Sequence, residues 1–374
     1  MRRVIICGGG FGGVATAVAL RRLVPGDLEI LLVDRRTDFV MGLRKIWAAL
    51  GTESLEVGRR RLADIDGVRV ATGEIEAIDP VARRVTVSGQ ALDADWLVIA
   101  LGAYQAVDAL PGLAEFAINV WDAATAESAQ PALAGQVSGP LSIGVFGLPY
   151  SCPPAPYELA LLARDTLPDA VEVTVFTPAP IALPVLGREQ SARLERLLAE
   201  RGIRFFADRR ATTVQAGRVE FDDGSGLDHD LLLAVPPHRC PQLLVAAGLA
   251  DPHGWVVPDP RTLETAFAGV YAIGDCTTIS LANGMAMPKA GALAQAMGET
   301  VAARIAADAV GRPPDATFAG EGHCFVEMGR GAAALAGGSF MADPPDIGIG
   351  EASESGLIEK REFETSRLSA WFGR

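Results

Sequence analysis

The sequence predicts an α/β fold: two Rossmann-like parallel-sheet units in series, followed by a small C-terminal α+β domain. Short apolar strands alternate with helix-length segments over the first hundred residues, and the same alternation starts again at residue 141. Such alternation is typical of parallel strands joined by crossover helices. Its repetition indicates an internal duplication of one dinucleotide-binding architecture. The chain has 374 residues, enough for two or three domains.

The first unit opens with a strand, a helix and a second strand. A buried strand is expected at Arg3–Cys7, a helix at Gly12–Leu23 and the next strand at Glu29–Val33. Residues 68–87 show the short polar and apolar pieces typical of an antiparallel insert. The segment "DWLVIALG" (95–102) then returns the chain to the sheet as a buried strand that ends in glycine.

The second unit repeats this order. Its predicted strands and helices lie at residues 141–147, 155–167, 171–176, 191–199, 202–207 and 230–235, with a small meander at 211–224. The chain then returns to the first unit through "GVYAIGDCTTI" and a long helix at 289–307. The tail contains "GHCFVEMG", a glycine- and proline-rich loop at 337–350 and a charged helix.

These elements predict three domains. The first is discontinuous, and the expected boundaries are residues 1–108 and 254–315 for the first domain, 109–253 for the second and 316–374 for the C-terminal domain.

Composition argues against several classes of function. The net charge is −13, so nucleic acid and anionic membrane surfaces are poor partners. No apolar run reaches the roughly 20 residues that span a bilayer. The initial apolar run, Val4–Cys7, is too short for a signal peptide, so we expect a cytoplasmic protein that contacts the inner membrane face peripherally at most. Five widely spaced cysteines favour neither a disulfide framework nor a metal site.

The first strand leads into the glycine pattern of a dinucleotide-binding loop. "CGGGFGG" places Gly8, Gly10 and Gly13 in the GxGxxG arrangement directly after a strand. The first glycine allows a tight turn, the second lets the backbone approach a pyrophosphate, and the third lets the helix pack closely on the sheet. Asp34 ends the next strand, where an acidic side chain accepts a hydrogen bond from a ribose hydroxyl.

Two later segments indicate that this dinucleotide is FAD. "GVYAIGDC" resembles the second flavin signature of the two-dinucleotide-domain, glutathione-reductase-like flavoproteins, and "DWLVIALG" resembles the motif that connects their domains. The resemblance implies that Asp275 holds the ribityl or pyrophosphate region and that the helix after Lys289 points its N-terminus at the flavin. Lys289 either adds a positive charge there or is a solvated residue at the helix start. The residues expected to bind FAD are Gly8, Gly10, Phe11, Gly12, Gly13, Asp34, Arg35, Lys45, Ala100, Gly102, Gly274, Asp275, Lys289 and Ala290.

The corresponding loop of the second unit lacks the features of a nicotinamide site. Gly144 and Gly147 are not followed by further glycines, and the next strand ends in "VFTPAP" instead of an acid or an arginine. Cys152 stands in this loop, ahead of two prolines that favour a helix start. A helix N-terminus favours the thiolate form, so Cys152 is a candidate nucleophile.

"CPPAPYE" (152–158) resembles the redox-cysteine motif of sulfide:quinone oxidoreductases and of the flavin subunit of flavocytochrome c sulfide dehydrogenases. In that family a second cysteine comes from the C-terminal domain, and "GHCFVEMG" matches with Cys324. "VPPHRCPQLLVAAGL" and "EFETSRLSAWFG" also look like this group, so the resemblance covers essentially the whole chain.

The resemblance implies a reaction and roles for three residues. Hydrosulfide, or a small thiol or persulfide, attacks a Cys152–Cys324 disulfide, and the electrons pass through FAD to a quinone or another acceptor. The C-terminal domain covers the flavin. Glu158 either assists proton transfer or caps the helix start, and Glu327 and His323 are weaker candidates. Cys7, Cys240 and Cys276 are expected to be structural.

The resemblance is incomplete at two places. Some family members carry a flavin-linking cysteine after the second strand, but "TDFVMGLRKIWAALG" has none, so non-covalent FAD is expected. The tail helix is short, and its apolar residues suit a membrane interface, the protein body or a dimer partner. These apolar residues are Leu357, Ile358, Phe363, Leu368, Trp371 and Phe372.

Three functions therefore remain open on the sequence. The first is the FAD-dependent oxidation of sulfide or a small thiol. The second is an NADH:acceptor dehydrogenase of the same two-domain class, against which the altered second loop argues. The third is a non-catalytic flavoprotein in which the cysteine pair responds to redox state. The sequence also leaves a homodimer open.

Overall fold

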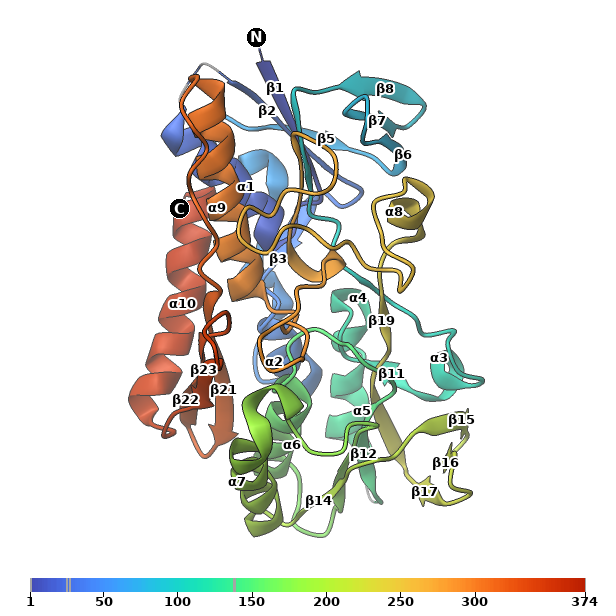
Figure 1. Cartoon of the computed structure of the whole chain (residues 1–374). Helices are drawn as coiled ribbons and strands as arrows, with labels where there is room; N and C mark the ends of the chain where they lie inside the picture. The colour runs from blue at the N-terminus through green and yellow to red at the C-terminus, as the bar shows by residue number, and fades with distance from the viewer. Residues whose placement is uncertain (1, 25, 27, 137–138, 374) are drawn as a thin grey trace.

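The computed structural model describes residues 2–24, 26, 28–136 and 139–373 (Figure 1). The first unit is a parallel sheet in the order β20-β9-β1-β2-β5. Its strands are β1 (Arg2–Cys7), β2 (Leu28–Asp34), β5 (Arg69–Thr72), β9 (Trp96–Ile99) and β20 (Val270–Ala272). The central strands are buried on both faces, which is why their sequences are continuously apolar and do not alternate.

Two helices, α1 (Phe11–Leu23) and α9 (Gly291–Ala309), lie side by side against this sheet (Figure 1). Small residues allow their close approach. A Cβ added at Gly298 would lie 2.5 Å from the carbonyl oxygen of Gly12. The C-terminal segment that returns to the first unit thereby positions the start of α9 beside the glycine loop that precedes α1.

The second unit is another parallel sheet, in the order β11-β18-β12-β13-β14. Its strands are β11 (Ile118–Asn119), β12 (Leu141–Val145), β13 (Val173–Phe176), β14 (Ile203–Phe206) and β18 (Leu231–Val235). The associated helices are α5 (Ala129–Gln136), α6 (Ala155–Thr166) and α7 (Gly187–Glu200). The predicted α/β class with two Rossmann-like units is confirmed, and predicted element boundaries differ from the observed ones by a few residues.

Each unit carries the predicted antiparallel insert. The strands of these inserts are β6 (Ile75–Asp79), β7 (Arg84–Val87) and β8 (Gln90–Asp93) in the first unit, and β15 (Ala211–Gln215), β16 (Arg218–Phe221) and β17 (Gly226–Asp228) in the second. The two segments that run between the units pair with each other as a short antiparallel sheet. Its strands are β10 (Tyr104–Gln105) and β19 (His238–Arg239). The smaller elements are α2 (Arg44–Leu50), α3 (Leu113–Phe116), α4 (Ala123–Ala126), α8 (Gln242–Ala246), β3 (Asp38–Val40) and β4 (Arg59–Arg61).

The C-terminal domain is an antiparallel sheet backed by a helix, as the predicted α+β class requires. It consists of β21 (Glu321–Gly329), β22 (Ala332–Ser339), β23 (Asp346–Ile349) and α10 (Glu354–Phe372). The expectation of a loop throughout 337–350 is wrong, because β23 pairs with β22 inside that segment. Glycine is needed in this strand pair for close approach, since a Cβ at Gly338 of β22 would lie 2.2 Å from the carbonyl oxygen of Asp346 in β23.

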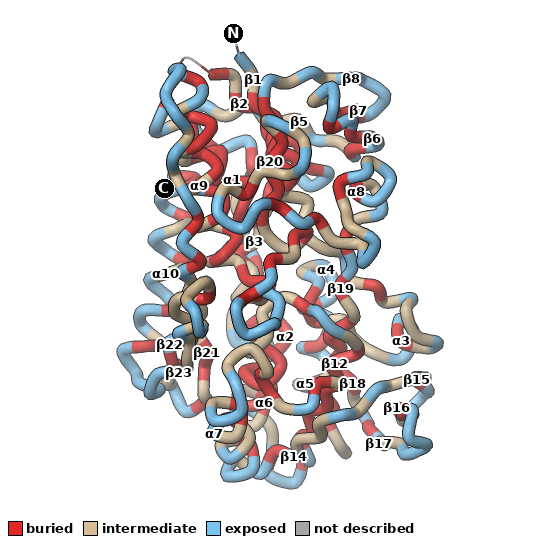
Figure 2. Tube along the Cα trace, in the orientation of Figure 1, coloured by how far each residue is buried: buried red, intermediate tan, exposed pale blue. Residues whose placement is uncertain are grey.

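The buried residues lie mainly in the two parallel sheets and in the helices that cover them. The inserts and the outer face of α10 are exposed (Figure 2). Leu368, Trp371 and Phe372 of α10 are buried in the core of the first unit, and Ile358 is exposed. The tail helix therefore packs on the body of the protein. Among the described residues, no helix is long and apolar enough to cross a membrane. The predicted domain boundaries stay predictions.

Candidate active site

One cavity of about 290 Å³ brings together most of the residues singled out in the sequence. Its walls come from the glycine loop before α1, from α2, from the start of α6, from the start of α9, and from β21 and α10. The predicted site residues on its surface are Gly10, Phe11, Gly12, Lys45, Ala100, Gly102, Cys152, Glu158, Gly274, Asp275, Lys289, Ala290 and Cys324. Four predicted residues lie outside its lining: Gly8, Gly13, Asp34 and Arg35.

The glycine loop has the geometry of a phosphate cradle. Gly8 has φ +113°, and a Cβ there would lie 2.3 Å from the carbonyl oxygen of Ala100. A Cβ at Gly13 would lie 1.8 Å from the Gly8 carbonyl oxygen, so both glycines are required by backbone packing. At Gly10 a Cβ would meet nothing within 4 Å, which leaves the space in front of the helix start open. A phosphate placed there meets free backbone N–H groups and the positive end of the helix dipole.

Asp34 ends β2 beside this loop and fixes its backbone. Its Oδ2 accepts a hydrogen bond from the Gly9 N–H at 2.6 Å, and its Oδ1 accepts one from the Arg36 N–H at 2.8 Å. Burial opposes ionisation of this carboxyl, but Arg36 and the two backbone donors outweigh burial and lower its pKa. Asp34 is therefore a charged acceptor at the end of the second strand, as a ribose contact requires. Arg35 follows it at an exposed position, and its role stays a prediction.

Two lysines place positive charge on the cavity wall. Lys289 Nζ donates to the carbonyl oxygens of Asp275 at 2.7 Å and Thr277 at 3.0 Å, and it lies 3.5 Å from the centre of the Trp255 ring. Lys289 is therefore not a solvated residue at the helix start. Lys45 Nζ donates to the Trp121 carbonyl oxygen at 2.7 Å. Burial lowers the pKa of both ammonium groups.

Cys152 occupies an unusual backbone conformation three residues before α6 begins. Its φ is +55°, unusual for a residue other than glycine, and its N–H donates to the Lys289 carbonyl oxygen at 2.7 Å. Cys324 reaches the same cavity from β21. All five cysteines are free thiols in this structure. The two thiols that line the cavity thus come from segments 172 positions apart, as 324 − 152.

The expectation that the helix start stabilises a Cys152 thiolate is wrong for this structure. Burial raises the pKa of the Cys152 thiol well above its usual range, and the neighbouring Cys324 and Glu158 raise it further. Burial also raises the pKa of Cys324 to about 11, with Glu158 the next cause. Desolvation of the thiolate is the largest cause of the raised pKa at both positions.

Glu158 belongs to a buried ionic network that reaches the tail helix. Lys360 Nζ donates to Glu158 and also to Glu327 Oε1 at 2.8 Å, and Trp47 Nε1 donates to the same Glu327 oxygen at 2.6 Å. Desolvation lowers the pKa of Lys360, but the two carboxylates outweigh it and raise that pKa. Burial raises the pKa of Glu158, and Lys360 opposes this shift. Lys360 is a site residue that the sequence analysis missed.

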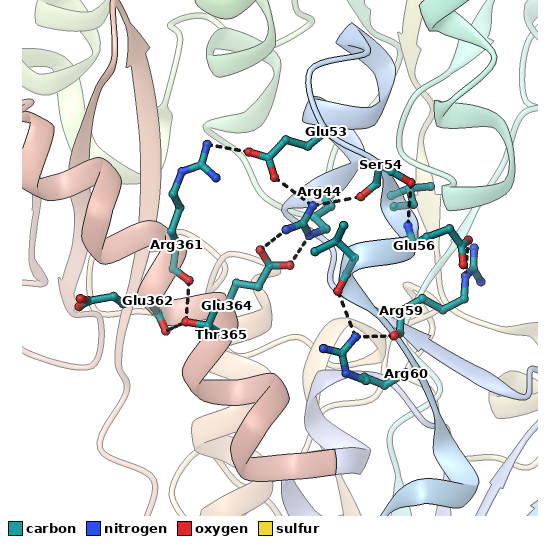
Figure 3. Close-up of polar contacts among 12 residues, drawn as sticks. Arg44, Glu53, Ser54, Glu56, Arg59, Arg60, Arg361, Glu362, Glu364 and Thr365 are labelled. Atoms are coloured by element: carbon teal, nitrogen blue, oxygen red, sulfur yellow. Dashed lines mark hydrogen bonds and ion pairs between the residues drawn. The ribbon is translucent and has the colours of Figure 1, made fainter. Parts of the chain in front are cut away.

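A second ion-pair network anchors α10 to the first unit (Figure 3). Arg44 donates to both carboxylate oxygens of Glu364, to Glu53 Oε2 at 3.1 Å and to the Ser54 carbonyl oxygen at 3.0 Å. Arg361 on the same helix pairs with Glu53 at 2.6 Å. Arg44 and Glu364 are both buried, so this contact fixes the position of α10 against α2.

The remaining candidates divide between the cavity and the core. His323 and Phe325 of β21 line the cavity together with Phe363 of α10, and the two phenylalanine rings meet edge to face at 5.8 Å. Cys7, Cys240 and Cys276 are buried away from it, as expected for structural residues. Among the described residues, no group of three or more His, Cys, Asp or Glu side chains has the arrangement of a metal site.

Comparison with known proteins assigns the family. The model of the pyridine nucleotide-disulphide oxidoreductases matches residues 2–304. The chain belongs to this family. It is 28% identical to the sulfide-quinone reductase of Aquifex aeolicus over 99% of this chain and 87% of that protein. The crystal structure of the sulfide:quinone oxidoreductase from the same bacterium superposes with a TM-score of 0.89 at 25% identity, covering 100% of this chain and 92% of the other.

A relative that matches a shorter part of the chain has a different name. An NADH dehydrogenase-like protein of Mycobacterium tuberculosis is 30% identical, but only over 61% of this chain and 60% of that protein.

The protein is an FAD-binding flavoprotein of this family. The geometry fits the cofactor. The space at Gly10 is open, and the cavity runs from the glycine loop to Lys45, Asp275 and Lys289, so the site has room for a bound dinucleotide.

Proposed function

We propose that this flavoprotein oxidises sulfide, or a small thiol or persulfide, through Cys152 and Cys324, and passes the electrons to a quinone. One observation carries the proposal: both thiols line the cavity that begins at the dinucleotide loop. The likeness to a sulfide-quinone reductase over 99% of the chain supports the same donor and acceptor. FAD, when bound, supplies a two-electron acceptor between the thiol pair and the quinone.

The cysteines perform the sulfur chemistry by thiol–disulfide exchange. Hydrosulfide attacks one sulfur of a Cys152–Cys324 disulfide, which breaks the S–S bond, forms a new one to the incoming sulfur, and leaves a persulfide and a thiolate. No electrons leave the protein in this step, and the thiol proton of the donor is released. A second hydrosulfide then attacks the outer sulfur of the persulfide and carries it away as hydrodisulfide, which leaves both cysteines as thiols. Closing the disulfide from these two thiols releases two protons and two electrons, and bound FAD would supply the acceptor for the electrons.

The buried charges around the pair control which thiol ionises. Lys360 and Lys45 lower the pKa of Cys152, whereas Glu158 and Cys324 raise it. A proton released at the cysteines finds a carboxyl group in Glu158, whose pKa burial raises. We assign Glu158 the role of proton acceptor, with Lys360 holding its carboxylate in place. The buried contact between Glu158 and Lys360 supports this role over the alternative of a helix cap, because a cap would not need a buried lysine as its partner.

The apolar end of the cavity suits a flat organic acceptor. Phe325 and Phe363 lie there beside Lys360, on the two elements that the C-terminal domain contributes. Aromatic walls with one polar group favour a planar ring that carries carbonyl oxygens, as a quinone does. The altered loop after β12 argues against NADH as the donor, because a Cβ at Gly147 would lie 2.8 Å from Pro237 and the loop is already packed.

An anaerobic titration of the FAD-loaded protein tests the proposal. Sulfide should bleach the flavin absorbance, and NADH should not. Cys152→Ser and Cys324→Ser should each abolish bleaching by sulfide, whereas Cys240→Ser, a buried cysteine outside the cavity, should leave it intact. Bleaching by NADH alone would support the dehydrogenase alternative. Full activity of both cavity variants would rule out the cysteine mechanism.

A further inference from the structure

A serine–histidine pair lies next to Cys152 and has no part in the sulfur chemistry described above. Ser151 lines the cavity, and its Oγ lies 3.1 Å from His238 Nε2. His238 belongs to β19, in the link between the two units, and the residue is 4% exposed. The other ring nitrogen, Nδ1, lies 2.9 Å from the Pro236 carbonyl oxygen.

The hydrogen-bond pattern assigns the protons of this pair. A carbonyl oxygen only accepts, so the His238 Nδ1 that faces Pro236 must carry a hydrogen. Burial lowers the pKa of His238 to about 4, opposed by the Pro236 contact, so the ring is neutral at neutral pH. In that tautomer Nε2 accepts, and the Ser151 hydroxyl must donate to it. Lys45 and Lys289, the cations nearest to the ring, also favour the neutral form.

Because its hydrogen is committed to His238, Ser151 can offer only lone pairs to the cavity. Its backbone pairs with Lys289, two residues before α9 begins, so the hydroxyl lies at the cavity wall formed by the start of that helix. The lining of the same cavity also carries donors: the N–H groups of Gly291 and Ala292 at the helix start and the ammonium group of Lys45. This wall therefore presents a fixed acceptor among donors.

The pyrimidine edge of a flavin has the complementary pattern, a single ring N–H (N3) between two carbonyl oxygens. We propose that Ser151, held by neutral His238, accepts the hydrogen bond of that N–H and positions the flavin. The lysines and the α9 N–H groups then suit the two carbonyl oxygens. The inference rests on FAD binding and is independent of the proposed sulfur donor.

The test compares Ser151→Ala and His238→Phe with Ser142→Ala. Ser142 is a fully buried serine of β12, outside the cavity lining, whose Oγ has no hydrogen-bond partner among the described residues, so it is a matched control. Each protein is reconstituted with FAD labelled with ¹⁵N at N3, without any sulfur donor, and the FAD dissociation constant is measured. An unsatisfied ring N–H should weaken FAD binding about 5- to 150-fold in Ser151→Ala. Its N3 resonance should move upfield from the hydrogen-bonded position.

His238→Phe should shift the N3 resonance in the same direction, because the freed Ser151 hydroxyl no longer presents only its lone pairs. Ser142→Ala should bind FAD with the affinity of the parent protein, and the N3 resonance of its bound FAD should be unchanged. An unchanged N3 resonance in Ser151→Ala would overturn the proposal, whatever happens to affinity. An unchanged resonance in His238→Phe would overturn the role given to the histidine. A raised KM for sulfide with an unchanged N3 signal would assign the hydroxyl to the donor instead, and equally overturn the proposal.

Discussion

Lys360 is the residue whose removal should damage the protein most clearly, and the damage should depend on pH. Its side chain is 2% exposed, and its ammonium group pairs with two carboxylates, Glu158 and Glu327, which are also buried. Lys360→Met keeps the length of the side chain and removes the charge. Breaking a buried ion pair from one side costs about 3–5 kcal/mol, a large share of a typical stability of about 5–15 kcal/mol.

The pH dependence follows from the carboxyl groups that are left behind. Burial already raises the pKa of Glu158 while Lys360 opposes the shift, so loss of the lysine raises this pKa further. A raised pKa in the folded state means that the folded protein binds a proton which the unfolded chain has released. The free energy of unfolding of Lys360→Met should therefore fall as pH rises above the usual carboxyl pKa. The deficit should be largest near pH 8 and smallest near pH 5.

Urea unfolding followed by tryptophan fluorescence at both pH values measures this effect. Arg361→Met is the matched control, because it removes the neighbouring charge on the same helix from a pair with Glu53 that is half exposed, worth about 0–1 kcal/mol. Lys360→Met with Glu158→Gln and Glu327→Gln should recover much of the loss at pH 8, since no unpaired charge then remains. The same deficit at pH 5 and pH 8, or one no larger than that of Arg361→Met, would refute this reasoning.

Three further predictions concern the glycine loop, the thiols and the tail helix. Gly10→Ala should leave the melting temperature of the apoprotein unchanged and weaken FAD binding. Gly13→Ala, whose Cβ would lie 1.8 Å from a backbone oxygen, should lower both the melting temperature and the affinity for FAD. Equal losses of melting temperature in the two variants would contradict this. Since the pKa of Cys324 is about 11, its alkylation by iodoacetamide in the reduced protein should accelerate about tenfold per pH unit from pH 7 to 10, and a plateau below pH 9 would contradict it. Arg44→Met should cost about 3–5 kcal/mol in urea unfolding, because Glu364 is left buried without its partner; a loss below about 1 kcal/mol would mean that α10 is held by packing alone.

Local sequence motifs predicted the parts of the site that depend on the local backbone conformation. The GxGxxG loop, the acid at the end of β2 and the cysteine before α6 each depend on a strand or helix end that a few adjacent residues define. The cavity brings these segments together because both Rossmann-like units direct their loops to the same region. The cysteine of β21 was found only through its resemblance to a known motif, since nothing in the residues between 152 and 324 shows that the two meet.

Side chains that act through distant partners were beyond the sequence. Lys360 lies 202 positions from Glu158, and His238 lies 87 from Ser151, so no local spacing links either pair. The thiolate prediction failed for a related reason. It used the helix dipole, which the sequence locates, without the burial of Cys152, which only the tertiary structure determines. The prediction of a loop at 337–350 was wrong because its glycines suggested a turn. In the structure these glycines allow two neighbouring strands to approach closely.

The position of α10 along its own axis decides which of its residues face the cavity. Lys360 and Glu364 lie one turn apart on the same face of α10, and each is buried against groups of opposite charge. Well-packed apolar residues at such positions are often as stabilising as a buried ion pair, so stability alone does not explain the charges. A shift of α10 by one turn would place Glu364 against Glu158 and Glu327, where like charges repel. We therefore expect the buried charges to disfavour the shifted register, and in the observed register Phe363 and Cys324 both line the cavity.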